Sequence, residues 1–390
     1  MQTSRFKASG INSEFASEPE FPFAEYIRNA RLMIETARMD IRQDNRETIL
    51  EANSPFELQP DPSLSPKTRS GKFEKGILLI HGLSDSPYLM KPIARHLQSK
   101  GFLVRAILLP GHGTVPGDLL NVSCDAWTKA VAYGVRRLRP HVEKLYMGGL
   151  STGGALSVWH TLKTAARIHG LILFSPAFKI KSRIARMSGI IRHFQKWIHT
   201  HEDLSYAKYE SFAFNAVHQL SHIIQDIRKM FLSGKKLTMP VFVASSLDDK
   251  TIDTHTTLDI FRARMISEKR RFILYTTDMA SCSQHTHHAI IPENSVFPEE
   301  HILDFSHVCI PLPPDDPHYG RDRDYAYLYY ENGKLRRMTE KQQVRLNGAK
   351  IWQGEDTKEN LKKRIFRRLT YNPAYDRMIG QLDDFLEGAM

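Results

Sequence analysis

The residue pattern best suited to covalent chemistry is a serine between closely spaced glycines, Gly149-Leu150-Ser151-Thr152-Gly153. It follows the apolar run Leu145–Met147 and precedes a stretch compatible with a helix, which is the strand-turn-helix setting of a G-x-S-x-G nucleophile turn. Such a turn needs small residues two positions before and after the serine, because neighbouring backbone would otherwise collide. The serine hydroxyl then projects above the sheet, and the following helix directs its positive end at a developing oxyanion. The alternative is a glycine-rich turn whose serine does no chemistry.

A nucleophilic serine needs a carboxylate that orients its base. Asp248 and Asp249 follow the apolar run Val241–Ala244, and both are candidates for this acid. We favour Asp249 because Ile252, an apolar residue three positions later, would fix the loop. Asp248 stays open as the rival.

The base must be a histidine. We favour His307, which closes the mostly apolar run Ile302–Phe305 and is therefore expected at the end of a strand. A polar stretch further upstream carries a competing cluster of His285, His287 and His288. The same cluster has only Cys282 near it as a further metal ligand, so a solvated loop is favoured over a metal site.

An oxyanion hole requires backbone amides close to the nucleophile. His81-Gly82-Leu83 follows the first apolar run, and the amides of Leu83 and Thr152 are the predicted donors. The alternative for this segment is an ordinary glycine turn between a strand and a loop.

Six short apolar runs recur along the chain, and stretches with helical spacing separate them. Continuous apolarity is typical of strands buried on both faces, as in a parallel sheet. The intervening stretches place apolar residues three and four positions apart, which predicts amphipathic helices. Alternating strands and helices favour an α/β fold with a mostly parallel central sheet flanked by helices. The runs are 77–80, 102–109, 145–147, 171–174, 241–244 and 272–275.

Composition and charge bound the class of protein. Of the 390 residues, 41% are hydrophobic and 25% are charged, which excludes a mainly disordered, collagenous or coiled-coil chain. The formal net charge of +11 favours acidic partners in general. Three scattered cysteines give no disulfide framework, and no apolar run approaches the roughly 18 residues that span a bilayer. We therefore expect a soluble, cytoplasmic protein.

These motifs resemble the α/β-hydrolase superfamily, and within it the carboxylesterase, monoacylglycerol lipase and lysophospholipase group. Serine, acid and histidine run in the family order. One departure is the separation of 58 residues between Asp249 and His307, which is longer than the family usually shows. Another is that the flanking segments match nothing in the family. The resemblance rests on Ile80-His81-Gly82-Leu83, Leu109-Pro110-Gly111-His112-Gly113, Asp125, Trp127, the turn around Ser151, the acid loop at Asp249 and Ser306-His307-Val308.

The resemblance also suggests how the chain is divided. A helix is expected over 23–39, a linker over 54–70, and a final helix whose apolar face runs from Tyr375 to Phe385. The expected parts are an N-terminal helical and linker extension (1–72), the hydrolase core (73–178 and 237–310), a helical cap (179–236), and a C-terminal extension (311–390) that ends in a helix packed on the core.

The activity implied by the resemblance is a serine carboxylic-ester hydrolase of acylglycerol or lysophospholipid type. Ser151, Asp249 and His307 would form its triad, with an acyl-enzyme intermediate and no cofactor or metal. Its substrate-binding residues would be His81, Gly82, His112 and Trp197. The alternatives are a peptidase, thioesterase or acyltransferase that uses the same triad, or a hydrolase fold without catalysis that serves as a binding module.

The positive charge is concentrated in the expected cap, which contains 11 Lys and Arg residues but only 4 Asp and Glu residues. A basic, aliphatic cap suggests docking on an anionic membrane surface or admission of an amphiphilic acyl substrate, and it argues against nucleic acid as a partner. In the alternative that we favour, the apolar stripe from Met187 to Ile198 packs on the core and its charges face solvent. A second basic run, expected on a solvated helical face, comprises Lys362, Lys363, Arg364, Arg367 and Arg368.

Overall fold

The structure is a computed structural model of the whole chain. It describes residues 5–12, 21–63, 65–164, 166–182, 187–200, 205–282, 287–323, 325, 328–331, 334–337, 351–363 and 365–389. The chain divides into two compact units, and each is described by itself. The first comprises 1–172 and 176–239, and the second 173–175 and 240–390.

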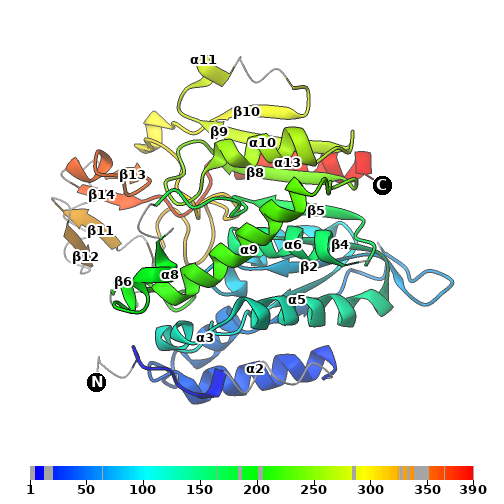
Figure 1. Cartoon of the computed structure of the whole chain (residues 1–390), viewed down its shortest axis with the longest axis horizontal. Helices are drawn as coiled ribbons and strands as arrows, with labels where there is room; N and C mark the ends of the chain where they lie inside the picture. Colours follow the sequence, from blue (N-terminus) through cyan, green and yellow to red (C-terminus); the bar gives the residue numbers. More distant parts are fainter. Residues whose placement is uncertain are drawn as a thin grey trace. The chain divides into compact units, whose positions relative to one another are not determined.

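Parallel strands form the sheet of the first unit (Figure 1). β2 (Phe73–Ile80) lies between β3 (Phe102–Ile107) and β4 (Val142–Leu150) and pairs in parallel with both. The short β1 (Phe56–Leu58) pairs antiparallel with β3, and β5 (Gly170–Phe174) follows β4 in the order of strands. Every residue of β3 and β5 is buried. The apolar runs predicted here as strands are therefore confirmed.

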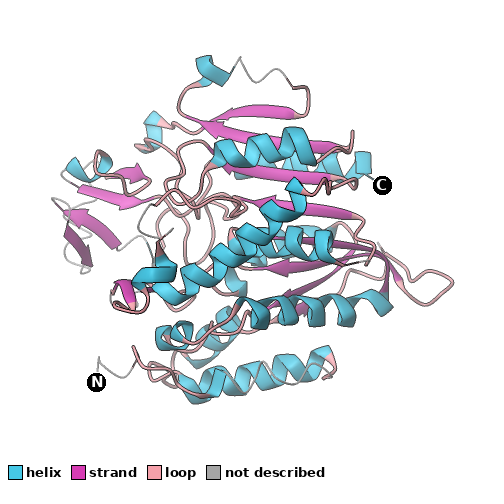
Figure 2. Ribbon diagram, in the orientation of Figure 1, coloured by secondary structure: helices cyan, strands magenta, loops and turns pink. Residues whose placement is uncertain are grey.

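Helices that connect these strands cover the sheet (Figure 2). α4 (Lys91–Ser99) contacts β3, α5 (Cys124–Leu138) contacts β2 and β3, and α6 (Thr152–Lys163) contacts β2 and β4. Their buried residues recur at spacings of three and four, as the sequence predicted: Ile93 and Leu97 in α4, and Trp127, Val131, Val135 and Leu138 in α5.

The second unit contains three more parallel strands, β8 (Val241–Ser246), β9 (Arg270–Thr276) and β10 (Ile290–Asn294). α10 (Thr254–Arg264) connects β8 to β9, and the short α11 (Met279–Cys282) precedes β10. The last helix, α13 (Tyr375–Ala389), packs on β8 and β9 and buries Met378, Leu382 and Phe385. Each unit thus has a mostly parallel sheet flanked by helices, and the predicted α/β class is confirmed.

A second, four-stranded sheet lies within the C-terminal residues (Figure 1). β14 (Ile365–Arg368) pairs in parallel with β13 (Trp352–Gly354) and antiparallel with β11 (Leu328–Glu331), which also pairs with β12 (Lys334–Arg337). The sequence did not predict this sheet, because its strands are only three or four residues long and two of them, β12 and β14, carry several cations.

The second basic run was expected on a solvated helical face, and this holds for Lys362, which is exposed on a helical turn, but was wrong for Arg367 and Arg368; Arg364 lies outside the described residues. The only helical turn described there is the 3₁₀ helix η6 (Asn360–Lys362), and Arg367 and Arg368 belong to strand β14. Arg367 is buried and donates to the side-chain oxygen of Gln353 at 2.9 Å. Arg367 and Arg368 are therefore structural groups of the sheet, whereas Lys362 and Lys363 are exposed.

The expected cap, 179–236, contains α8 (Ser188–Ile191), the short paired strands β6 (Trp197–His199) and β7 (Phe212–Ala213), and the long α9 (Phe214–Leu232). α9 packs on α5 and α6. The favoured expectation that the apolar stripe from Met187 packs on the core was wrong for three residues, because Met187, Ile190 and Phe194 are exposed. The boundaries of a cap stay a prediction.

The N-terminal helices α2 (Phe23–Ala37) and α3 (Arg46–Asn53) pack against the residue that follows β3, Leu108. The buried hydroxyl of Tyr26 on α2 donates to the Leu108 carbonyl and accepts from the Leu108 N–H, both at 3.0 Å. One side chain thus satisfies both backbone groups of the residue at which the chain leaves the sheet.

No helix of the described residues is long and apolar enough to cross a membrane. The expected cytoplasmic location stays a prediction.

The first prediction concerns Tyr26. In Tyr26→Phe the buried N–H and C=O of Leu108 lose their partner, and we expect the free energy of unfolding to fall by about 1–3 kcal/mol. Urea denaturation followed by circular dichroism measures the change. Tyr146→Phe is the matched control, because no described residue is a hydrogen-bond partner of that hydroxyl. Equal stability of the two variants would contradict the assigned role of Tyr26.

Candidate active site

Ser151 occupies a strained turn between β4 and α6. Its backbone has φ 52° and ψ −111°, a conformation that non-glycine residues rarely adopt. Strain of this kind persists only where the surroundings fix it, and it is typical of functional sites. The side chain is 7% exposed, and Thr152, the next residue, begins the helix. This is the local geometry that the sequence predicted for a nucleophile turn.

The two glycines of the turn are required by close packing against the end of β2. A Cβ atom on Gly149 would lie 2.2 Å from the carbonyl oxygen of Ile80, and one on Gly153 would lie 2.0 Å from the same atom. Any other residue at either position would therefore displace the backbone of the turn or of β2. The predicted reason for small residues on both sides of Ser151 is confirmed.

The two segments predicted to supply the oxyanion donors lie beside the serine in the first unit. As the first residue of α6, Thr152 has an N–H without an acceptor inside the helix. A Cβ atom on Gly82 would lie 3.5 Å from the Cβ of Ser151, so the loop that carries Leu83 passes next to the serine. The segments that carry Thr152 and Leu83 thus both pass beside Ser151, and the role of their amides as oxyanion donors stays a prediction.

His81 and His112 link the loops around this serine through hydrogen bonds of their rings. Nε2 of His81 accepts from the Leu109 N–H at 3.0 Å, which leaves its Nδ1–H to donate to the Gly82 carbonyl at 2.8 Å. Nε2 of His112 accepts from the Ser84 N–H at 3.2 Å. Burial lowers the pKa of both rings, that of His112 to about 4, so both are neutral near pH 7. They were predicted to contact substrate, but neither ring is exposed.

A feature that the sequence did not indicate is the docking of residues 5–12 on the glycine loop after β3. The side-chain oxygen of Asn12 accepts from the Gly111 N–H at 2.8 Å, and its amide donates to the His112 carbonyl at 3.2 Å. Ser9 binds Asp118 through both its backbone N–H and its hydroxyl. The N-terminal segment therefore fixes the loop that carries His112.

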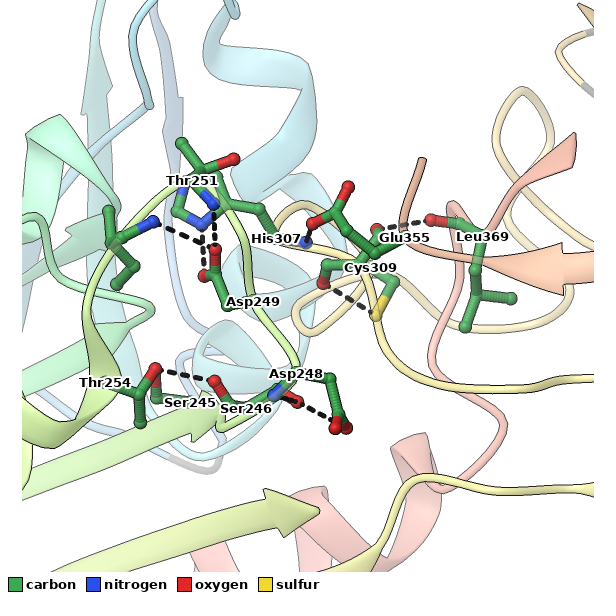
Figure 3. Close-up of polar contacts among 12 residues, drawn as sticks. Ser245, Ser246, Asp248, Asp249, Thr251, Thr254, His307, Cys309, Glu355 and Leu369 are labelled. Atoms are coloured by element: carbon green, nitrogen blue, oxygen red, sulfur yellow. Dashed lines mark hydrogen bonds and ion pairs between the residues drawn. The ribbon is translucent and has the colours of Figure 1, made fainter. Parts of the chain in front are cut away.

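In the second unit, Asp249 and His307 lie in direct contact (Figure 3). Oδ2 of Asp249 is 2.5 Å from Nδ1 of His307, and both side chains are buried. The other carboxylate oxygen accepts from the backbone N–H groups of Thr251 and Ile252 at 2.7 and 3.0 Å. Ile252, the apolar residue expected to fix this loop, is buried, and its backbone N–H is one of these two donors. The structure brings together the two residues predicted as acid and base.

The pKa of His307 reflects opposing effects. Burial lowers it, but the charge of Asp249 and the hydrogen bond to that carboxylate outweigh burial, so the pKa lies above its usual value. Protonation is thus favoured, as expected for an imidazole that collects a proton during a reaction.

Asp248, the rival acid, has other partners. Its carboxylate accepts from the hydroxyls of Ser295, Thr277 and Ser246 at 2.6, 3.0 and 3.1 Å. These bonds tie the end of β8 to the ends of β9 and β10. Asp248 therefore links the ends of three strands, and it takes no part in the hydrogen bond to His307.

The setting of His307 differs from expectation in one respect. It was predicted to follow a strand, but 303–306 form no strand, and only Ile302 makes isolated bridges to Phe297 and Gln353. The loop is instead held from the C-terminal residues, with Glu355 accepting from the His307 N–H at 3.0 Å. No motif marks Glu355 in the sequence, because its role arises only from this long-range contact.

Of the competing histidines, His285 lies outside the described residues. His287 accepts from the Arg270 guanidinium at 2.7 Å, and its ring stacks on that of His288. Within the described part of the chain, no three His, Cys, Asp or Glu side chains gather as metal ligands.

Trp197, predicted to bind substrate, lies on β6 and is half-buried. Its ring meets that of Phe6 edge to face at 5.2 Å between centroids. Phe6 also lines a cavity of about 480 Å³ with Lys7, Arg192, His193 and Lys196.

Comparison with known proteins supports the fold assignment. Residues 71–214 match the family model described as serine aminopeptidase, S33. A carboxylesterase from Bacillus subtilis is 24% identical over 206 residues, which cover 50% of this chain and 81% of that protein. A thermostable monoacylglycerol lipase from a Bacillus species is 30% identical over 114 residues, or 29% of this chain and 45% of that protein.

Solved structures also resemble this chain. A metagenome-derived lipolytic enzyme of the LipS and LipT study is 22% identical with a TM-score of 0.48, covering 57% of this chain and 86% of that one. A monoacylglycerol lipase from Paleococcus ferrophilus is 15% identical with a TM-score of 0.45, covering 57% of this chain and 88% of that one.

The strand-turn-helix around Ser151, the parallel sheets, and the matches to the family model and the Bacillus relatives agree with one another. Over residues 71–214 this chain matches the α/β-hydrolase family, and it is a distant relative of a carboxylesterase and a monoacylglycerol lipase.

Proposed function

We propose that the protein is a serine carboxylic-ester hydrolase in which Ser151 is the nucleophile, His307 the base and Asp249 the orienting acid. The observation that carries this proposal is the buried 2.5 Å contact between Asp249 and Nδ1 of His307. It leaves Nε2 of the same ring as the atom that exchanges protons with a serine. The strained turn at Ser151 supports the choice of nucleophile.

The proposed reaction has two halves. Ser151 Oγ attacks the ester carbonyl carbon while its proton passes to Nε2 of His307, and the N–H groups of Leu83 and Thr152 bind the oxyanion. The carbon–oxygen bond to the alcohol then breaks, and His307 returns the proton to the leaving oxygen. In the second half, water attacks the acyl-enzyme by the same route and releases the carboxylic acid. Because the base must start neutral, activity requires a pH above the pKa of His307.

For the substrate we propose an acylglycerol or a lysophospholipid. The carboxylesterase and monoacylglycerol lipase relatives support ester substrates of this kind. In this proposal Gly82 borders the substrate, because a Cβ atom at this position would lie 3.5 Å from the Cβ of Ser151. The buried rings of His81 and His112 contribute by fixing the backbone of the loops around the ester.

A second candidate activity is peptide hydrolysis with the same three residues. It is favoured by the description of the matching family model, which names a serine aminopeptidase. Both activities use an acyl-enzyme, so only the leaving group and the substrate contacts separate them.

We further propose that the segment around α8 docks on anionic lipid. Met187, Ile190 and Phe194 are 55, 65 and 88% exposed, which is unusual for large apolar side chains. The nearby cavity of about 480 Å³ is lined by three basic side chains, Lys7, Arg192 and Lys196. Phe6, whose ring contacts that of Trp197, also lines it. Apolar groups for the acyl region beside cations for phosphate groups are typical of a membrane-surface site.

The second prediction tests the nucleophile. Ser151→Ala should abolish labelling by a fluorophosphonate probe and lower kcat for nitrophenyl esters by about 10⁴-fold or more. Esters of graded chain length report the acyl preference, and aminoacyl amides report peptidase activity. Ser233→Ala, at an exposed position after α9, is the control. Ester turnover that survives in Ser151→Ala would rule out the proposed function, and turnover of amides alone would replace esterase by peptidase.

The third prediction separates the two candidate acids. Asp249→Asn should lower kcat by about 10⁴-fold because the ring of His307 loses its orienting partner. Asp248→Asn should leave most of the rate, since Asp248 binds hydroxyls of neighbouring strands. Steady-state kinetics on folded variants measures both. A larger loss in the Asp248 variant would reverse the assignment.

The fourth prediction concerns lipid. The wild-type protein should float with vesicles that contain about a third anionic lipid at low salt, and less well at high salt, which screens surface charges. Phe194→Asp should weaken this binding. Leu232→Asp changes an apolar residue that is 71% exposed at the end of α9, and it should bind as wild type does. If both variants bind equally, the segment around α8 is not the lipid site.

A further inference from the structure

The loop that carries His307 is attached along its length to the C-terminal residues. Two of these contacts pair its main chain with that of Gln353 in β13. The two are Leu303 N–H to Gln353 O and Gln353 N–H to His301 O. Three further contacts join residues on both sides of His307 to residues that follow β13 and β14. They are Glu355 N–H to Asp304 Oδ1, Ser306 Oγ to Leu369 O, and Asn372 N–H to Leu312 O.

Glu355 makes the contact with His307 itself (Figure 3). It directly follows β13, and its side chain is 1% exposed. Oε2 accepts from the His307 N–H at 3.0 Å, while Oε1 accepts from Nε of Arg368 at 3.0 Å. Each carboxylate oxygen thus has a defined partner, and the side chain cannot rotate without losing one of them.

The charges around Glu355 belong to a small buried group. Arg368 on β14 pairs with it, and Asp356 and Asp249 add negative charge nearby. Burial raises the pKa of Glu355 to about 7, against the lowering effect of Arg368. The charge of Glu355 in turn raises the pKa of His307, and that of Arg368 lowers it.

Buried ion pairs contribute little to stability, because the loss of hydration offsets the attraction between the charges. The position of this pair is more informative, since it touches the backbone of the residue whose ring binds Asp249. We propose that Glu355 is a positioning residue, supplied by the C-terminal extension, that holds the backbone of His307 so that its ring stays aligned with Asp249. This inference rests on the proposed function, in which His307 is the base.

The arrangement predicts different effects for two substitutions. Glu355→Ala removes the acceptor of the His307 N–H, and we expect kcat to fall about 10- to 100-fold with KM changed less than about threefold. Glu355→Gln keeps an acceptor oxygen but removes the charge. It should retain kcat within about threefold on the pH plateau, and the acid limb of the kcat/KM profile should move to lower pH.

Three controls accompany this fifth prediction. Glu300→Gln changes a carboxylate that pairs with Arg321 in the same unit and does not contact His307; its pH profile should match that of wild type. Circular dichroism reports whether each variant is folded. The pKa of His307, followed by NMR in ¹⁵N-histidine protein and assigned with His307→Gln, should fall in Glu355→Gln and stay constant in Glu300→Gln.

The outcomes separate this inference from the function on which it rests. If esters are hydrolysed through Ser151 but Glu355→Ala keeps wild-type kcat, the inference is wrong and the proposed function stands. If Glu355→Ala does not fold, Glu355→Gln decides, because this variant keeps the acceptor of the His307 N–H, and a fall of its plateau kcat by more than about tenfold would overturn the inference. If no substrate is turned over, the proposed function fails, and the NMR titration still tests whether Glu355 acts on His307.

Discussion

The close approach between the end of β2 and the turn after β4 constrains the whole first unit. The carbonyl oxygen of Ile80 occupies the space that a side chain at position 149 or 153 would fill. Only glycine fits at both positions, and between them Ser151 adopts a positive φ and α6 begins at Thr152. The strain is tolerated because the parallel pairing of β2 with β4 fixes both partners.

The loops around this turn are held by groups far away in the sequence. Tyr26 satisfies the residue after β3, Asn12 binds the glycine loop, and His81 and His112 join that loop to the one after β2. The imidazole rings of His81 and His112 connect these loops as neutral hydrogen-bonding groups, and their burial keeps them uncharged. Residues at the beginning of the chain are therefore part of the scaffold of the serine, although no motif marks them.

The sequence predicted what local patterns determine. Strands buried on both faces have continuous apolar runs, so β2, β3, β4, β5, β8 and β9 were found at their places. The G-x-S-x-G spacing predicted the turn, because only glycine avoids a collision with neighbouring backbone at these two positions. β10 was missed because it contains Pro292 and polar residues, which are typical of an edge strand. β14 was missed because its arginines have internal acceptors, Gln353 for Arg367 and Glu355 for Arg368. Glu355 was missed because its contact with His307 spans 48 residues.

The attachment of the His307 loop to β13 and β14 has a consequence for biosynthesis. A chain grows from its N-terminus, and domains fold as their residues emerge. The acid loop and the histidine are made well before Glu355, which follows His307 by 48 residues. On the role proposed for Glu355, the histidine gains its backbone support only after β13, Glu355 and β14 have been synthesised. Full activity would then appear only after these residues have left the ribosome, and not when the triad residues alone have been made.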